Sequence, residues 1–157
     1  MWYNCCLENL NDYRLWHATL VGPKNTSYQG GTFQIKIKFP DEYPLKAPIA
    51  YFYTPIYHIN VNPKAPKSPG DLPLGYISIP TLNYWKPENS IKELLINIFV
   101  LLSKPNPYDP YGLDRAEELR INRNKYEEKV RKFTKMYANL FKCQNKYDRN
   151  KDWNFNL

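Results

Sequence analysis

Alternating apolar and polar residues predict β-strands in the first third of the chain. The clearest strand covers residues 33–39, where every second residue is a large apolar one. Residues 15–21 and 49–53 show similar patterns, and residues 2–8 are expected to add a fourth strand. Because the links between these segments are short and rich in turn residues, the pattern predicts an antiparallel meander.

A segment dense in proline and glycine separates the strands from the helical part. Residues 61–74 carry this composition, and we expect them to protrude as a loop. Further along, Ser90 and Glu93 have the spacing of a capping box, which predicts a helix over residues 91–103. Pro105 cannot continue that helix and is expected to stop it.

Two more helices are predicted in the last third. Asp114 is expected to cap a short helix that ends near Ile121, and Asn122 to cap a long one that reaches at least Lys142. A meander followed by helices is typical of the α+β class. The sequence therefore predicts a four-stranded antiparallel meander sheet flanked by helices.

Length and composition fit one folded domain. The 157 residues are 43% apolar, and we assign residues 1–145 to the domain and residues 146–157 to a polar and aromatic tail. No apolar run is long enough for a membrane span, and the first residues lack the pattern of a signal peptide, so a cytoplasmic or nuclear location is expected. The three cysteines lack the spacing of zinc ligands, so we expect structural thiols, no metal and no cofactor.

The net charge of +7 is concentrated in the last forty residues. A basic helix can bind nucleic acid or a membrane surface. Neither a glycine-rich phosphate loop nor a nucleic-acid motif accompanies it here. We therefore interpret the basic residues as a solvated helix face and expect no nucleic-acid partner.

Six short motifs follow one another in a recognisable order. They are GPKNTSYQGG (22–31), FP with YPLKAP (39–48), YHIN (57–60), GYISI (75–79), WKP (85–87) and PNPYDP (105–110). Together they resemble the ubiquitin-conjugating enzyme family, and the resemblance covers roughly residues 10–140. It implies the family's α+β fold, although the family's amino-terminal helix is missing from this sequence.

The resemblance also implies a site. Ser78 stands where the family has the cysteine that accepts the carboxyl end of ubiquitin as a thioester. Asn60 matches an asparagine that stabilises an oxyanion or braces a loop, and Asp109 matches an acidic residue near the incoming lysine, or else caps a turn. His58 matches a family residue that looks structural, and we expect it to be buried and hydrogen-bonded.

Serine changes the chemistry that this site can support. A cysteine thiol, with a pKa of about 8.5, supplies some thiolate near neutral pH, whereas a serine hydroxyl needs a general base. The two histidines, His17 and His58, show no readable Ser-His-Asp arrangement with Ser78. Ser78 and the Ile-Pro-Thr-Leu that follows it are also similar to conjugating-enzyme variants that keep the fold and lack the cysteine.

Three interpretations remain open. The first is a catalytically silent variant that binds ubiquitin, a ubiquitin-like protein or an active conjugating enzyme. The second is an active enzyme in which serine has replaced the cysteine to trap a stable oxyester. The third is an adaptor that reuses the fold, with the basic helix and aromatic tail as its interaction surface. In each case Glu88 places a charge where the family contacts RING ligases, beside Leu45 and residues 85–87, so ordinary RING binding is expected to be weak.

Overall fold

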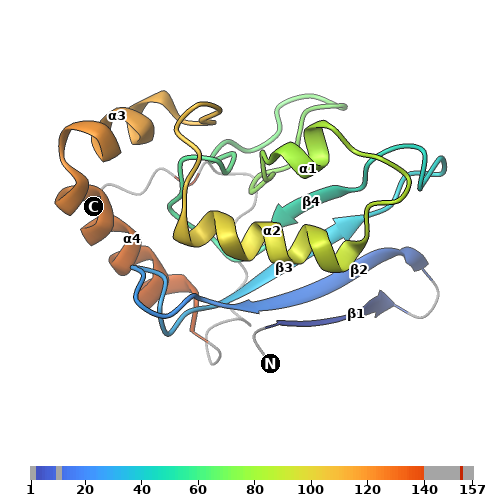
Figure 1. Ribbon diagram of the computed structural model, residues 1–157, viewed down its shortest axis with the longest axis horizontal. Helices are drawn as coiled ribbons and strands as arrows, with labels where there is room; N and C mark the ends of the chain where they lie inside the picture. The colour runs from blue at the N-terminus through green and yellow to red at the C-terminus, as the bar shows by residue number, and fades with distance from the viewer. Residues whose placement is uncertain (1–2, 10–11, 140–152, 154–157) are drawn as a thin grey trace.

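The computed structural model describes residues 3–9, 12–139 and 153. It has four strands in one antiparallel sheet with the order β1-β2-β3-β4, and Figure 1 shows α2 crossing one face of that sheet while α3 and α4 lie at one end. The strands are β1 (Tyr3–Asn9), β2 (Asp12–Val21), β3 (Thr32–Lys38) and β4 (Ile49–Phe52). The helices are α1 (Pro80–Asn83), α2 (Ile91–Ser103), α3 (Leu113–Ile121) and α4 (Arg123–Tyr137). This confirms the predicted α+β class and the antiparallel sheet flanked by helices.

The register of β2 and β3 brings the predicted apolar faces together. Ala18 pairs with Ile35, and Leu20 pairs with Phe33, so that alternate residues of both strands point to one side. All four side chains are buried in a core that also receives apolar residues of α2. Burying this face against α2 supplies the main driving force for the fold.

The first predicted helix is confirmed at both ends. The Ser90 hydroxyl accepts the Glu93 N–H at 3.1 Å, and the Glu93 carboxylate accepts the Ser90 N–H at 3.0 Å. This capping box satisfies two amides that have no partner inside the helix. The helix ends at Ser103, two residues before Pro105.

The beginning of α3 differs from the prediction. Gly112, in extended conformation, is the N-cap, and no side chain caps the helix. Asp114 is not the cap but lies in the first turn, where its negative charge still interacts favourably with the helix dipole. The predicted end at Ile121 is correct.

The beginning of α4 is as predicted, and its end is not. Asn122 caps the helix by accepting the Lys125 N–H at 3.1 Å. The helix ends at Tyr137 rather than continuing to Lys142. The carbonyl of the buried Ala138 accepts the Thr32 N–H at 2.8 Å. The residue that follows the helix is therefore hydrogen-bonded to the first residue of β3.

Several predictions concern residues outside the described part. Of the predicted tail only Trp153 is described, so the boundary at residues 145–146 stays a prediction. The same holds for the cysteine thiols, because neither the side chains of Cys5 and Cys6 nor any part of Cys143 is described. Within the described ranges, none of the helices combines the length and apolarity that a membrane crossing requires.

Candidate functional site

Ser78 lies on a short extended segment that continues the sheet beyond β4. The Ile77 N–H donates to the Ala50 carbonyl at 3.1 Å, and the Ser78 N–H donates to the Asn60 carbonyl at 2.9 Å. Ile77 and Ile79 point into the core on either side of Ser78. The backbone of Ser78 is therefore fixed by neighbours from both directions, and the residue is buried, with 6% of its surface exposed.

Gly75 allows the chain to enter this segment. Its φ of +86° lies in a region that favours glycine, and its carbonyl accepts the Phe52 N–H at 2.8 Å. A Cβ at this position would stand 2.1 Å from the Phe52 carbonyl oxygen. The close approach of these two backbones therefore requires glycine three residues before Ser78.

The structure brings Asp109 to Ser78. The Ser78 hydroxyl donates to Oδ2 of Asp109 at 2.5 Å, and the Asn83 side-chain amide donates to the same oxygen at 3.3 Å. Asp109 comes from the loop before α3, and Asn83 is the last residue of α1. The carboxylate remains exposed on its other side. The serine therefore acts as a hydrogen-bond donor to an acidic residue 31 positions away in the sequence.

Asn60 joins the loop around Asp109 to the central part of the fold. Its Nδ2 donates to the carbonyls of Asn106 at 2.7 Å and Asp109 at 2.8 Å, and its Oδ1 accepts the Asn106 N–H at 2.9 Å. Asn60 is fully buried. Since an amide group has two N–H donors and both are used here, this arrangement braces the loop and leaves no donor for an oxyanion.

His58 is buried and has both ring nitrogens engaged. Its Nδ1 accepts the Asn60 N–H at 3.0 Å, so the proton lies on Nε2, which donates to the Leu101 carbonyl at 3.1 Å. Burial lowers the pKa of His58 to about 4, and the Leu101 hydrogen bond offsets this only in part. The predicted buried role of His58 is confirmed, and His58 is not placed to act as a base for Ser78.

The other histidine lies on the sheet. His17 belongs to β2, where its ring packs edge-to-face against Tyr53 with 6.3 Å between ring centroids. Among the hydrogen bonds of the described residues, the Ser78 side chain has Asp109 as its partner and no histidine. The site therefore contains a Ser-Asp pair without the imidazole that would complete a triad.

The loop predicted over residues 61–74 is closed at its base by Asn62. Its backbone N–H donates to the Tyr76 carbonyl and its carbonyl accepts the Gly75 N–H, both at 2.8 Å. The Asn62 side chain also donates to the carbonyls of Lys64 at 3.2 Å and Pro73 at 3.1 Å. This residue was missed by sequence reasoning, although an asparagine before a proline is a common turn signal.

The tip of the same loop is ordered by Asp71. Its Oδ2 accepts the backbone N–H groups of Lys67 and Ser68, each at 2.9 Å. Residues 66–72 are exposed, so the loop protrudes from the surface. The hydrogen bonds of Asp71 order its tip, and those of Asn62 hold its two ends together.

Two tyrosines extend from the surface beside the Ser-Asp pair. Tyr84 follows Asn83 in the chain and is 79% exposed, and Tyr108 precedes Asp109 and is 94% exposed. Exposed aromatic side chains of this kind are typical of surfaces that bind proteins. The surface beside Ser78 therefore carries two exposed aromatic side chains.

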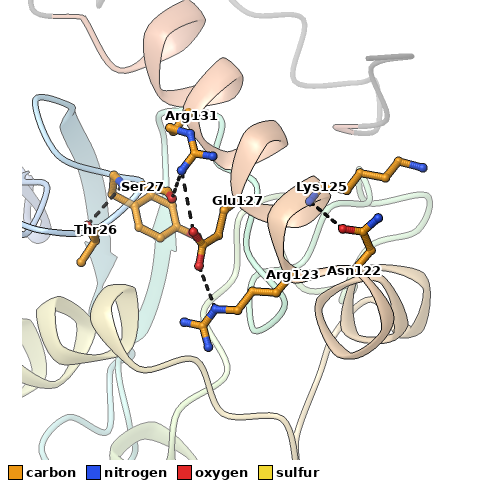
Figure 2. Close-up of polar contacts among 8 residues, drawn as sticks. Thr26, Ser27, Asn122, Arg123, Lys125, Glu127 and Arg131 are labelled. Atoms are coloured by element: carbon orange, nitrogen blue, oxygen red, sulfur yellow. Dashed lines mark hydrogen bonds and ion pairs between the residues drawn. The ribbon is translucent and has the colours of Figure 1, made fainter.

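The basic helix α4 forms ion pairs along its surface. Figure 2 shows Arg123 and Arg131 on opposite sides of Glu127, with closest distances of 2.8 and 3.7 Å. Arg131 also donates to the Ser27 hydroxyl at 3.1 Å, and Lys129 pairs with Glu118 at 2.8 Å. The two carboxylates offset part of the local charge, which favours the interpretation of a solvated helix face.

Together, the meander sheet, the helices that flank it and the braced loop around position 78 define a ubiquitin-conjugating fold. The sequence model for "Ubiquitin-conjugating enzyme" matches residues 3–134, and the chain belongs to this family. It is 36% identical over 132 residues to the probable ubiquitin-conjugating enzyme E2 31 of Arabidopsis thaliana, a match covering 84% of this chain and 80% of that protein. It is also 36% identical over 121 residues to the ubiquitin-conjugating enzyme E2 T of Danio rerio, covering 77% of this chain and 60% of that protein.

Proposed function

We propose that this protein is a catalytically silent member of the ubiquitin-conjugating enzyme family that binds ubiquitin or a ubiquitin-like protein. An active conjugating enzyme is a further candidate partner. The observation that carries the proposal is the hydrogen bond from Ser78 to Asp109 at a site without a histidine base. The location proposed for the protein is the cytoplasm, the nucleus or both.

The hydroxyl of Ser78 lacks the means to become a nucleophile. Its hydrogen-bond acceptor is the carboxylate of Asp109, and a carboxylate is a weak base toward an alcohol. His58 is held neutral elsewhere in the core. An ester formed at Ser78 would also be less activated toward an amine than a thioester.

The surroundings of Ser78 retain features that suit binding. Asn60 holds the loop that presents Tyr108 and Asp109, and the exposed Tyr84 directly follows the helix α1. These groups support the proposal that a modifier contacts this face although no covalent bond is made.

Recruitment by an ordinary RING ligase is not part of the proposal. Leu45 is 77% exposed and is free to make an apolar contact, whereas Glu88 is exposed in the neighbouring loop. A partner that covers Glu88 with apolar atoms would have to remove water from a carboxylate.

One alternative assigns the same surface to the protein but assumes that Ser78 is not the natural residue. If serine has replaced a natural cysteine, the parent protein is an active conjugating enzyme, and the braced loop with Asn60 and Asp109 is the observation that favours it. The adaptor interpretation depends on the basic helix, part of whose charge is offset by ion pairs with Glu118, Glu127 and Glu128.

An adduct assay tests the proposal. The chain is incubated with activating enzyme, ATP and fluorescent ubiquitin, and the products are separated with and without reductant. We expect no adduct from the unmodified chain, together with NMR shift changes in labelled ubiquitin when the two proteins are mixed. An adduct at Ser78 that resists reductant but is cleaved by hydroxylamine would favour the active-enzyme alternative. A reductant-sensitive adduct at Cys5, Cys6 or Cys143 would refute the silent interpretation.

The variant Ser78→Cys completes the assay. If it forms a reductant-sensitive adduct, the activating-enzyme interface is intact and Ser78 alone accounts for the silence. If it forms none, the chain also lacks a working interface with the activating enzyme.

A further inference from the structure

Trp153 is buried far from its neighbours in sequence. It is 2% exposed, and its backbone is held from two sides, with its N–H donating to the Pro63 carbonyl at 2.7 Å and its carbonyl accepting from Nη2 of Arg115 at 2.8 Å. The indole ring covers Gly75, because a Cβ built on Gly75 would lie 2.9 Å from Cη2 of the ring. Three separate segments therefore meet at this one residue, two of them at its backbone and one at its indole ring.

Two of those segments carry the Ser78–Asp109 pair. Gly75 lies three residues before Ser78 and begins the extended segment that holds it. Arg115 lies in the first turn of α3, which directly follows the loop that contains Asp109. Trp153 thus contacts both of the segments whose relative position sets the distance between the Ser78 hydroxyl and the Asp109 carboxylate.

The arginine in this cluster is firmly placed. Arg115 is buried, and its guanidinium carbon lies 4.3 Å from the centre of the Tyr57 ring. A cation on an aromatic face is stabilised by the ring quadrupole. Nη2 of Arg115 donates to the backbone carbonyl of Trp153. Trp153 therefore provides a hydrogen-bond acceptor for a buried polar group of α3, while its indole ring fills space above Gly75.

The third contact reaches the protruding loop. Pro63 belongs to the first leg of that loop, immediately after Asn62, which staples its base. The glycine beneath the indole has no side chain, so the ring can approach the backbone closely. A larger residue at position 75 would exclude the indole from this place.

We propose that Trp153 is a positioning residue: it clamps the segment that carries Ser78 to the segment that carries Asp109 and so maintains their hydrogen bond. The clamp acts through Gly75 on one side and Arg115 on the other. This inference rests on the contacts of Trp153 and is independent of whether the site binds ubiquitin.

Hydrogen exchange of the full-length chain tests the clamp. In Trp153→Ala we expect amides of residues 75–78 and of Tyr111 to exchange about tenfold faster, while those of β3 keep their rates. Trp153→Phe, which retains an aromatic ring, should restore most of the protection. Tyr13→Ala removes an exposed aromatic side chain from β2 and should leave both segments unchanged.

A second readout follows the pair itself. In Ser78→Cys, the nearby carboxylate of Asp109 should raise the pKa of the introduced thiol, measured by peptide-resolved alkylation across a pH series. Adding Trp153→Ala should move that pKa back toward about 8.5, because the two segments can then separate. A residue that contributes only general stability would not change the thiol's pKa.

The outcomes separate the clamp from simple packing. If Trp153→Ala folds poorly, Trp153→Leu keeps an apolar side chain that is too short to cover Gly75, and it should show the same local effects in weaker form. Local loss of protection together with the lowered thiol pKa supports the clamp. Equal acceleration of exchange in β3, or an unchanged thiol pKa, would overturn it.

Discussion

Ser78 and Asp109 are joined by a hydrogen bond of 2.5 Å in which the hydroxyl donates and the carboxylate accepts. A hydroxyl is suited to this position because it stays neutral and offers a proton. A thiolate in the same place would face the negative charge of Asp109 and would be destabilised. The geometry is thus well matched to serine.

This pairing predicts the acidity of a thiol at position 78. In Ser78→Cys the thiol should have a pKa above about 8.5, and the double variant with Asp109→Asn should lower it by about one unit, because the opposing charge is gone. The rate of alkylation at position 78, followed against pH by mass spectrometry, measures both values. Asp114→Asn removes a carboxylate elsewhere on the surface and serves as the control. Equal thiol pKa values in the presence and absence of the Asp109 charge would contradict the prediction.

Asn60 should be the most important polar side chain for stability in this region. Asn60→Ala removes three hydrogen bonds between the Asn60 side chain and the backbone groups of Asn106 and Asp109. At about 1 kcal/mol for each bond, the free energy of unfolding should fall by about 3 kcal/mol. Urea denaturation measures the change, and Asn97→Ala, at an exposed position on α2, should cost less than about 1 kcal/mol. Similar costs for the two variants would show that the bracing is unimportant.

Asn62 should control the order of the protruding loop without affecting the sheet. Asn62→Ala removes the side-chain bonds to Lys64 and Pro73, and the free energy of unfolding should fall by about 1–2 kcal/mol. Hydrogen exchange of residues 63–75 should accelerate while that of β3 stays unchanged. The matched variant Asn62→Asp keeps the acceptor for the Lys64 N–H but loses the donors, so it should show nearly the same effect. If the loop keeps its full protection in both variants, Asn62 is not the staple.

The elements that were predicted correctly are those coded by local patterns. Alternation over residues 33–39 predicted β3 to within one residue, because a strand with one buried face must alternate. The Ser90 and Glu93 spacing predicted the start of α2, because the capping box is a contact within four residues. In both cases the residues that determine the element lie within the element itself or directly beside it.

The errors and omissions involve contacts between distant residues. The end of α4 depends on the bond between Thr32 and Ala138, which no pattern within the helix records. The four-residue helix α1 is too short to show a periodicity. Likewise, the order of motifs placed Ser78 and Asp109 in one region, but their direct hydrogen bond depends on the folded loops.

The Glu88 charge should weaken RING binding. We expect a generic RING domain to bind the unmodified chain weakly and to bind Glu88→Ala up to about tenfold more tightly, since the variant removes the cost of desolvating a carboxylate. NMR titration with the labelled chain measures both affinities. Lys86→Ala changes a charge in the same exposed loop and should not reproduce the gain. If the unmodified chain binds the RING domain tightly and Glu88→Ala binds it with the same affinity, this explanation is excluded.

The buried His58 should make the protein less stable in mild acid. Burial lowers its pKa to about 4, whereas in the unfolded chain the pKa is near 6.5. Between these values the unfolded state binds a proton that the folded state does not, so the free energy of unfolding decreases as the pH falls from about 6.5 to about 4. Between pH 7 and pH 5 the loss should be about 2 kcal/mol.

Urea denaturation across this range should show the slope in the unmodified chain and in His17→Gln, where His58 is retained. In His58→Gln the slope should largely disappear, although that variant is less stable at every pH because the bond to Leu101 is altered. If the unmodified chain and His58→Gln lose the same free energy between pH 7 and pH 5, protonation of His58 is not the cause.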